Sequence, residues 1–145
     1  MAMVGGGVDE RITRRAAQAG LVLEREVVCE LTQYLELLFR WNRRMNLTAL
    51  TDDDTGVDRL VIEPLAAAQL LPEGCTAIID IGSGGGSPAI PMKLVLPTTS
   101  LRMVESKVRK GTFLKEVVRQ LGLRDTEVLN CRYEELVARP ETHEV

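Results

Sequence analysis

The residues best suited to chemistry form one glycine-rich stretch that begins at Asp80 and ends at Pro88. It reads D-I-G-S-G-G-G-S-P. Glycines reach positive φ angles easily and let a ligand approach the main chain closely. A carboxylate at the end of a strand, and free N–H groups at the start of the following helix, lie where ligands bind in open α/β sheets. The stretch therefore predicts a binding site for a nucleotide-type cofactor.

The spacing of the glycines separates two cofactor classes. Gly82, Gly84 and Gly86 follow a G-x-G-x-G pattern, whereas the dinucleotide fingerprint needs its third small residue at the position of Ser87. With its preceding apolar strand and Asp80, the pattern resembles motif I of the class I S-adenosylmethionine (AdoMet) methyltransferases. The alternatives at this point are an NAD-dependent oxidoreductase and a glycine loop that only turns the chain.

The elements that must position this stretch follow from the distribution of apolar residues. Residues 77–81 are predicted to form a short buried strand, and residues 101–104 and 127–131 a second and third strand. Helices are predicted after each strand. Glu105 closes the second strand, where a carboxylate can accept hydrogen bonds from ribose hydroxyls. The pattern indicates an α/β fold with three parallel strands.

The region before the sheet is predicted to be helical. A short helix over residues 9–19 has Asp9 as its cap and Gly20 as its stop, and the longest helix covers residues 24–44. A polar turn at 51–54 can cap a third helix that runs to about residue 71. We expect a disordered tail over residues 1–8, a helical region over 9–72, and the front half of a Rossmann-like domain over 75–145.

The end of the longest helix is strongly basic. Arg40, Arg43 and Arg44 surround Trp41, and arginine beside an aromatic ring suits phosphate contact and base stacking. The same residues also fit a basic helix end that complements the helix dipole, with Trp41 in the core. The basic helix predicted over residues 106–121 likewise has a solvated or an RNA-facing surface.

Composition narrows the possible partners and compartments. The chain has 145 residues and a net charge of −3, so any nucleic-acid surface must be a local patch. Its three scattered cysteines and the lone His143 argue against a metal site and fit a reducing cytoplasm. No apolar run approaches the length of a membrane span. We expect a cytoplasmic protein with no metal and no membrane partner.

Four segments in order resemble the RsmG/GidB family of bacterial guanine-N7 methyltransferases of 16S ribosomal RNA. Residues 37–48 are similar to the family's LL-x-x-WN-x-x-x-NLT signature, and residues 80–91 to its glycine motif. Residues 104–114 and 132–135 continue the resemblance. It implies a Rossmann-like class I AdoMet-dependent methyltransferase fold with a helical N-terminal region. It also implies methyl transfer from AdoMet to N7 of a guanine in 16S rRNA of the small ribosomal subunit.

The resemblance also implies roles for individual residues. Those on the cofactor side are Asp80, Gly82, Gly84, Gly86, Ser87, Glu105, Tyr133 and Glu134. Those on the substrate side are Asn46, Glu63 and Arg132, with Arg40, Arg43 and Arg44 as candidates for phosphate contacts. No catalytic residue is identified, since guanine N7 carries a free lone pair and needs no general base.

The chain departs from the family pattern at five positions. Leu60 replaces a histidine, Glu63 an aspartate, Pro64 a serine, Ser87 a bulky apolar residue and Ala89 a glycine. Leu60 removes a polar group expected near the substrate. A sheet of this class has seven strands, so three strands indicate part of a longer chain. A non-catalytic remnant that binds AdoMet or RNA is the main alternative function.

Overall fold

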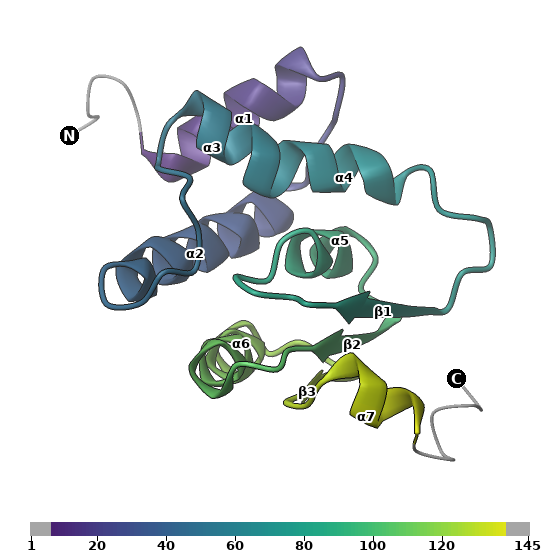
Figure 1. The fold of residues 1–145 in the computed structure, drawn as a ribbon. Coiled ribbons are helices and arrows are strands. Elements are labelled where there is room, and N and C mark those ends of the chain that lie inside the picture. The colour runs from purple at the N-terminus through teal and green to yellow at the C-terminus, as the bar shows by residue number, and fades with distance from the viewer. Residues whose placement is uncertain (1–6, 139–145) are drawn as a thin grey trace.

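A parallel sheet of three strands organises the structure, a computed structural model that describes residues 7–138 (Figure 1). The strands are β1 (Ala77–Ile81), β2 (Ser100–Val104) and β3 (Thr126–Leu129), in the order β1-β2-β3. Ile78 pairs with Leu101, and Leu101 with Thr126. The predicted parallel α/β architecture is confirmed, although β3 begins and ends earlier than the 127–131 expected from the sequence.

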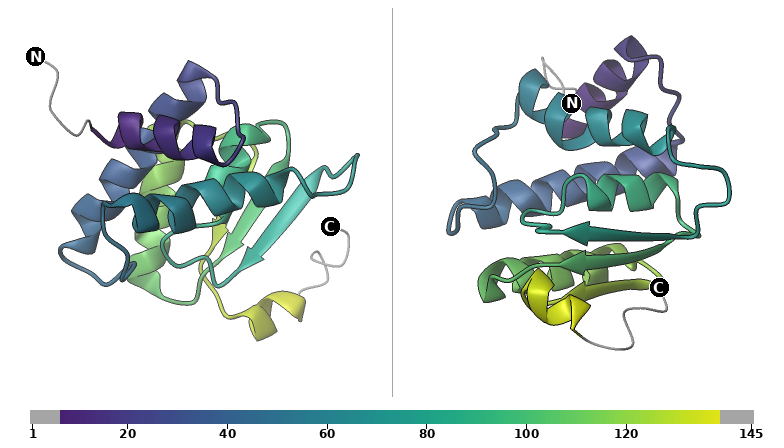
Figure 2. Two further views of the ribbon diagram at one scale, coloured as in Figure 1. Left: turned by 90° about the horizontal axis from the view of Figure 1, so that it is seen from above. Right: turned by 45° about the vertical axis from the view of Figure 1, so that its right-hand side comes forward.

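Helices α5 (Ala89–Val95) and α6 (Val108–Leu121) connect the strands, and α2 (Arg25–Asn42) packs against both helices. The start of α5 follows the glycine loop directly. Gly122, at φ +60°, ends α6 as predicted, because a left-handed residue stops a helix. The carboxyl ends of β1 and β2 lie on the same side of the molecule as the end of α2 (Figures 1 and 2).

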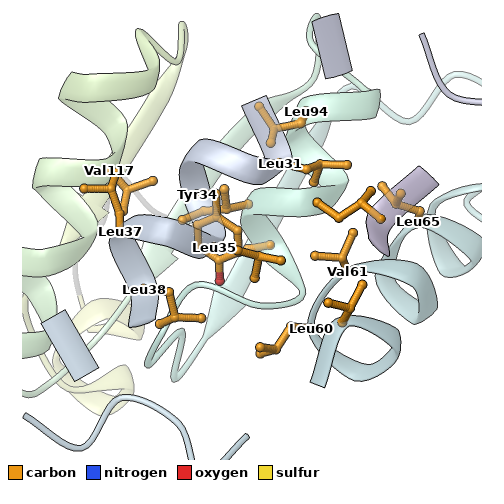
Figure 3. Packing of buried hydrophobic residues seen from close by; sticks show 14 of the residues in the cluster. Leu31, Tyr34, Leu35, Leu37, Leu38, Leu60, Val61, Leu65, Leu94 and Val117 are labelled. Atoms are coloured by element: carbon orange, nitrogen blue, oxygen red, sulfur yellow. The ribbon is translucent and has the colours of Figure 1, made fainter. Parts of the chain in front are cut away.

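The core lies between α2 and the helices on either side of it (Figure 3). Leu31, Tyr34, Leu35 and Leu38 recur at the three- and four-residue spacing of one helix face, and all are fully buried. Burying a leucine of this kind contributes about 2 kcal/mol. This spacing gives α2 one apolar face, and that face places the helix directly behind the glycine loop.

The other face of the sheet is less covered. Ile79 is 41% exposed and Ile81 47% exposed, so the prediction that residues 77–81 form a buried strand is wrong. The physical reason is that no helix within residues 7–138 packs closely over this face of β1, which is also an edge strand and pairs only with β2 there. At the other side of this face, α7 (Tyr133–Val137) packs Leu136 against β2.

The N-terminal helices form a separate group beyond α2 and α5 (Figure 2). They are α1 (Val8–Gln18), α3 (Asp54–Val57), the π-helix η1 (Asp58–Ile62) and α4 (Glu63–Ala68). The single helix expected from 54 to 71 therefore contains a π-helical segment. None of the helices within residues 7–138 has the length and apolar character to cross a membrane.

Two predictions at the start of the chain need correction. Val8 is helical and does not belong to a disordered tail, while residues 1–6 lie outside the described part of the chain. Gly7 is the N-cap of α1, so Asp9 is not the cap. Asp9 instead lies in the first turn, where a carboxylate also complements the helix dipole. The cap predicted within residues 51–54 is confirmed at α3, where the Asp53 side chain accepts a hydrogen bond from the Gly56 N–H at 2.7 Å.

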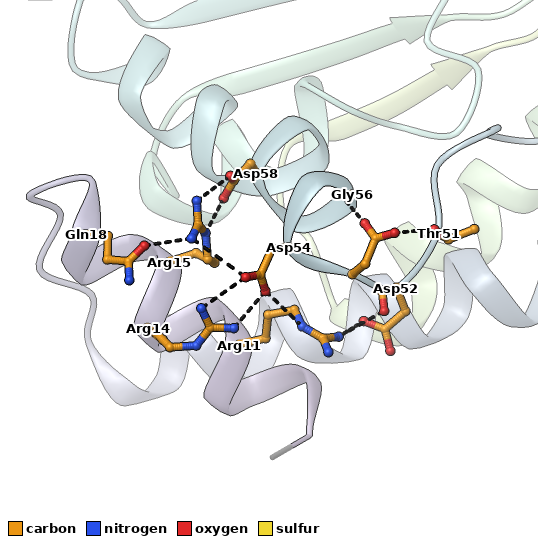
Figure 4. Close-up of polar contacts among 10 residues, drawn as sticks. Arg11, Arg14, Arg15, Gln18, Thr51, Asp52, Asp54, Gly56 and Asp58 are labelled. Carbon is orange, nitrogen blue, oxygen red and sulfur yellow. Dashed lines mark hydrogen bonds and ion pairs between the residues drawn. The ribbon is translucent and has the colours of Figure 1, made fainter. Parts of the chain in front are cut away.

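A network of arginines and aspartates joins α1 to the segment that follows α2 (Figure 4). Asp54 pairs with Arg14 at 2.7 Å and Asp58 pairs with Arg15 at 2.7 Å, while Arg11 reaches Asp52 at 2.6 Å. The hydrogen bond from Arg14 holds the pKa of Asp54 below its ordinary value. The network therefore stabilises the packing of α1 only while its carboxylates are ionised.

Substituting Asp54 with asparagine is expected to lower thermal stability at pH 7 and to flatten its pH dependence. A carboxylate whose pKa is lowered by folding adds stability above its unfolded pKa of about 4, and that stability is lost as pH falls through the folded value. Melting curves of wild type and Asp54→Asn between pH 7 and pH 3 measure this difference. Glu73→Gln, an exposed carboxylate with no ion pair among residues 7–138, is the control. Parallel pH profiles for all three proteins would contradict the prediction.

Candidate cofactor site

The loop between β1 and α5 has a backbone that requires glycine. Gly82, Gly84 and Gly86 have φ angles of +75°, +53° and +94°. These angles lie in the left-handed region, which side chains with a Cβ rarely adopt. The G-x-G-x-G spacing in the sequence thus places a glycine at each of three positions, 82, 84 and 86, where the loop after β1 has a left-handed backbone.

Glu105 holds this loop against the end of β2. One carboxylate oxygen, Oε1, accepts a hydrogen bond from the Gly84 N–H at 2.8 Å, and Oε2 accepts one from the Lys107 N–H at 2.9 Å. Glu105 is only 5% exposed. The Gly82 N–H adds a bond to the Val104 carbonyl at 2.8 Å. The acidic residue expected to contact ribose therefore also fixes the glycine loop, and each of its oxygens keeps a lone pair for a further donor.

Tyr34 anchors the loop from the side of α2. Its hydroxyl donates to the Gly85 carbonyl at 2.7 Å, and burial raises the pKa of this fully buried side chain. A Cβ on Gly85 would lie 3.1 Å from Leu38 Cδ1 and 3.2 Å from the Leu47 carbonyl oxygen. The loop thus packs backbone-close against α2 and the segment after it. The sequence does not reveal this contact, since helix periodicity indicates that Tyr34 is buried but not which group its hydroxyl binds.

Ser87 anchors the loop from the third side, at η1. Its hydroxyl donates to the Leu60 carbonyl at 2.8 Å. Pro64, four residues after Leu60, has no N–H and cannot make the usual helical bond to that carbonyl. Two of the departures from the family pattern, Pro64 and Ser87, therefore meet at one carbonyl: the first removes a donor and the second provides one.

The glycines differ in what surrounds them. A Cβ added to Gly82 would meet nothing within 4 Å, and one added to Gly84 only the Gly82 carbonyl oxygen at 3.9 Å. A Cβ on Gly86 would lie 2.5 Å from Cδ1 of the buried Ile90. Gly82 and Gly84 consequently border open space, whereas Gly86 is required for packing between the loop and α5.

A hollow of about 370 Å³ opens beside Gly82 at the ends of the strands. Tyr133 and Glu134, at the start of α7, line it together with Ser106 after β2. Its volume is in the range of small-molecule sites, about 300 to 1,000 Å³. The structure thus brings together residues from the three predicted cofactor segments. Arg132, expected on the substrate side, lines this hollow as well and lies with the cofactor candidates.

Asp80 supplies a polar group without a partner at the same end of the sheet. Its Oδ2 atom is buried and has no hydrogen-bond partner within residues 7–138. Burial, together with the nearby Glu105, raises the pKa of the Asp80 carboxyl. Buried polar atoms normally have partners, so this oxygen fits a site that receives a hydrogen-bond donor from a ligand.

The remaining candidates lie around the loop on other sides. Glu63 is exposed and lines a second hollow, of about 420 Å³, with Leu60, Pro64 and Ser87. Asn46 is exposed in the connection after α2. The last three candidates line a groove at the end of α2: Arg40, Arg43 and Arg44. In the part of the chain that the structure describes, no three His, Cys, Asp or Glu side chains form a metal-binding group, and His143 lies outside it.

Comparison with known proteins identifies the family. The family model of rRNA small subunit methyltransferase G, or GidB, matches residues 28–145. The chain belongs to the rRNA small subunit methyltransferase G family. This confirms the resemblance seen in the four sequence motifs, and it favours the methyltransferase interpretation over the NAD-dependent alternative.

Individual members of the rRNA small subunit methyltransferase G family align over most of the chain. The protein of that name from Dichelobacter nodosus is 40% identical over 133 residues, which are 92% of this chain and 62% of the relative. The one from Xylella fastidiosa (strain M23) is 44% identical over 116 residues, 80% of this chain and 54% of the relative. The chain thus spans about three-fifths of the first relative's length and about half of the second's.

Proposed function

We propose that this chain binds AdoMet and takes part in methyl transfer to N7 of a guanine in 16S rRNA of the small ribosomal subunit. The observation that carries the proposal is the glycine loop, which Glu105 fixes from one side while Gly82 and Gly84 border open space. Family membership and the names of the relatives support the same activity. In this proposal the sheet region over 75–145 is the front half of a Rossmann-like class I methyltransferase domain, preceded by a helical region over 9–72.

The residues around the loop fit such a cofactor by their chemistry. The orphaned Asp80 carboxylate oxygen suits an ammonium donor, and the second lone pairs of Glu105 suit ribose hydroxyls. Tyr133 is half-exposed beside the hollow and offers a ring face to an adenine, with Glu134 next to it. Gly86 and Ser87 act indirectly, because they fix the loop to α5 and η1.

The chemical demand on the protein is modest. AdoMet, when bound, supplies a methyl group on a positively charged sulfonium. Guanine N7 presents a lone pair, so the chain needs no general base, and its residues contribute by holding two reactants in line. Glu63 and Leu60 line a hollow that is separate from the one beside Tyr133. These two residues and Asn46 are proposed to face the substrate base. Access to N7 requires an unstacked guanine, as in an RNA loop.

Methyl transfer is the direct test of this function. Small ribosomal subunits that lack the modification are incubated with the chain and isotope-labelled AdoMet, and digested rRNA is examined by mass spectrometry for labelled N7-methylguanosine. Labelled product that requires the chain supports the proposal. AdoMet binding by calorimetry without any product supports the non-catalytic alternative, which the apolar Leu60 in the second hollow favours. Absence of AdoMet binding to the folded chain contradicts the proposal and leaves, of the alternative, only a remnant that binds RNA.

Removing the Tyr34 hydroxyl is expected to loosen the glycine loop on the side that faces α2. Tyr34→Phe loses the 2.7 Å bond to the Gly85 carbonyl, which is worth about 1 kcal/mol of stability. A less firmly held loop should also lower AdoMet affinity severalfold, measured by calorimetry at a temperature where the variant is folded. Unchanged affinity together with lower stability would show that Tyr34 supports the fold alone.

A further inference from the structure

A groove of about 630 Å³ lies between the end of α2 and the start of α6. Three of the arginines along it belong to α2 or its C-terminal end, Arg40, Arg43 and Arg44, and a fourth, Arg109, comes from α6. All four are exposed. Two segments about 65 residues apart in the sequence thus bring positive charge to one place.

The charge in the groove is not neutralised by the protein. Among residues 7–138, ion pairs involve Arg11, Arg14, Arg15 and Arg119, and none involves the four groove arginines. No acidic side chain lines the groove. The whole chain nevertheless has a net charge of −3. A local cluster of unpaired guanidinium groups on an acidic protein attracts an anionic ligand of its own.

The groove also has apolar lining residues, one of which packs against the buried core. These residues are Trp41 and Met45. The Trp41 ring packs against Phe113 of α6 with ring centroids 5.5 Å apart and planes tilted by 59°, and Phe113 is fully buried. Guanidinium groups around an aromatic ring suit single-stranded nucleic acid, in which phosphates meet the charges and a base stacks on the ring.

Residues close in sequence to those of the groove reach the cofactor hollow and the glycine loop. Arg109 follows Ser106 by three residues, and Ser106 lines that hollow. In α2, the turn that precedes Trp41 contains Leu38, which contacts the glycine loop at Gly85. A strand of nucleic acid in the groove would therefore pass close to the loop.

We propose that this groove binds a single-stranded segment of the RNA substrate, with its phosphates on Arg40, Arg43, Arg44 and Arg109 and a base against Trp41. The choice of RNA rests on the proposed function, while the charge and the aromatic lining are observed independently of it. An acidic protein would also meet the arginines, and competition by polyglutamate tests that alternative.

Paired variants with equal charge test this inference. Arg43→Gln with Arg109→Gln removes one charge from each helix at the groove. The control, Arg25→Gln with Arg124→Gln, removes one exposed charge at the start of α2 and one just after the end of α6, away from the groove. The probe is a fluorescein-labelled single-stranded RNA of about 12 nucleotides, within the site sizes of such proteins. Anisotropy is measured from low to moderate salt, and AdoMet affinity is measured in parallel.

The groove variant is expected to lose more than tenfold in RNA affinity at low salt and about 1.4 units of the slope of log affinity against log salt, from two contacts of about 0.7 each. The control should retain the wild-type slope, and both variants should bind AdoMet normally. Trp41 is the only tryptophan in the chain, so its emission should be quenched as RNA saturates the groove.

Three outcomes would overturn the inference: equal losses in groove and control variants, no quenching of Trp41 during RNA binding, or displacement of RNA by polyglutamate at equal charge. Failure of wild type to bind RNA even at low salt would also overturn it. If wild type does not bind AdoMet, this result counts against the proposed function. The RNA-binding outcomes above still decide the inference about the groove.

Discussion

Replacing Glu105 with alanine is expected to lower the free energy of unfolding by about 3 kcal/mol and AdoMet affinity by at least tenfold. Glu105 is only 5% exposed. Its carboxylate accepts two backbone hydrogen bonds, from the Gly84 N–H at 2.8 Å and from the Lys107 N–H at 2.9 Å. Bonds to a charged group contribute about 1.5 to 3 kcal/mol each, and the two amides would be left without their acceptor. The loop should then lose its fixed position over the end of β2.

Chemical unfolding and calorimetry measure the two effects of Glu105→Ala. Glu127→Ala, an exposed glutamate on β3, is the matched control and should change neither quantity by more than about 0.5 kcal/mol. An AdoMet analogue with a 2′,3′-dideoxyribose separates the two roles of Glu105. If wild type binds both ligands equally, Glu105 fixes the loop and does not contact the ribose. A variant that keeps wild-type stability would refute the loop role.

Two glycine substitutions in the same loop are expected to fail in opposite ways. Gly86→Ala places a Cβ 2.5 Å from buried Ile90 at φ +94°, so overpacking and backbone strain together should destabilise the fold by about 3 kcal/mol or more. Gly84→Val faces open space at φ +53° and should destabilise the fold by about 1 to 3 kcal/mol of strain alone. Its branched side chain should instead exclude AdoMet.

The measurement compares unfolding free energy with AdoMet affinity for each glycine variant. Gly84→Val should remain folded and lose at least tenfold in affinity, about 1.4 kcal/mol. Gly86→Ala should lose stability first. Normal AdoMet affinity in folded Gly84→Val would contradict the placement of the cofactor beside this loop, because the added side chain would extend into the open space that Gly84 borders.

The sequence predicts the elements of this fold well because their signals are local. Leu31, Leu35 and Leu38 repeat at helical spacing, and the apolar run ending at Ile81 is followed at once by glycines. The same signals mislead about burial at β1. A continuous apolar run is typical of a strand covered on both faces, whereas Ile79 and Ile81 lie exposed on an edge strand.

The contacts that build the site are less predictable, because they join positions far apart in the chain. Glycine spacing identifies the loop, but nothing near Tyr34 or Leu60 in the sequence indicates that either would bond to it. Arg132 shows the same limit. Its motif predicts a place on the substrate side, and only the structure shows that it is the N-cap of α7 and lines the same hollow as Tyr133.

The three anchors of the glycine loop come from α2, η1 and the end of β2, and this arrangement links cofactor binding to cooperative unfolding. The loop cannot open at Gly84 or Gly85 without releasing a buried group on another element. A ligand that binds only the closed loop then adds its linkage free energy to the whole folded unit, about 2.7 kcal/mol at a concentration 100 times its dissociation constant. Amides in α1 and α2, remote from the hollow, should therefore exchange with solvent more slowly when AdoMet is present.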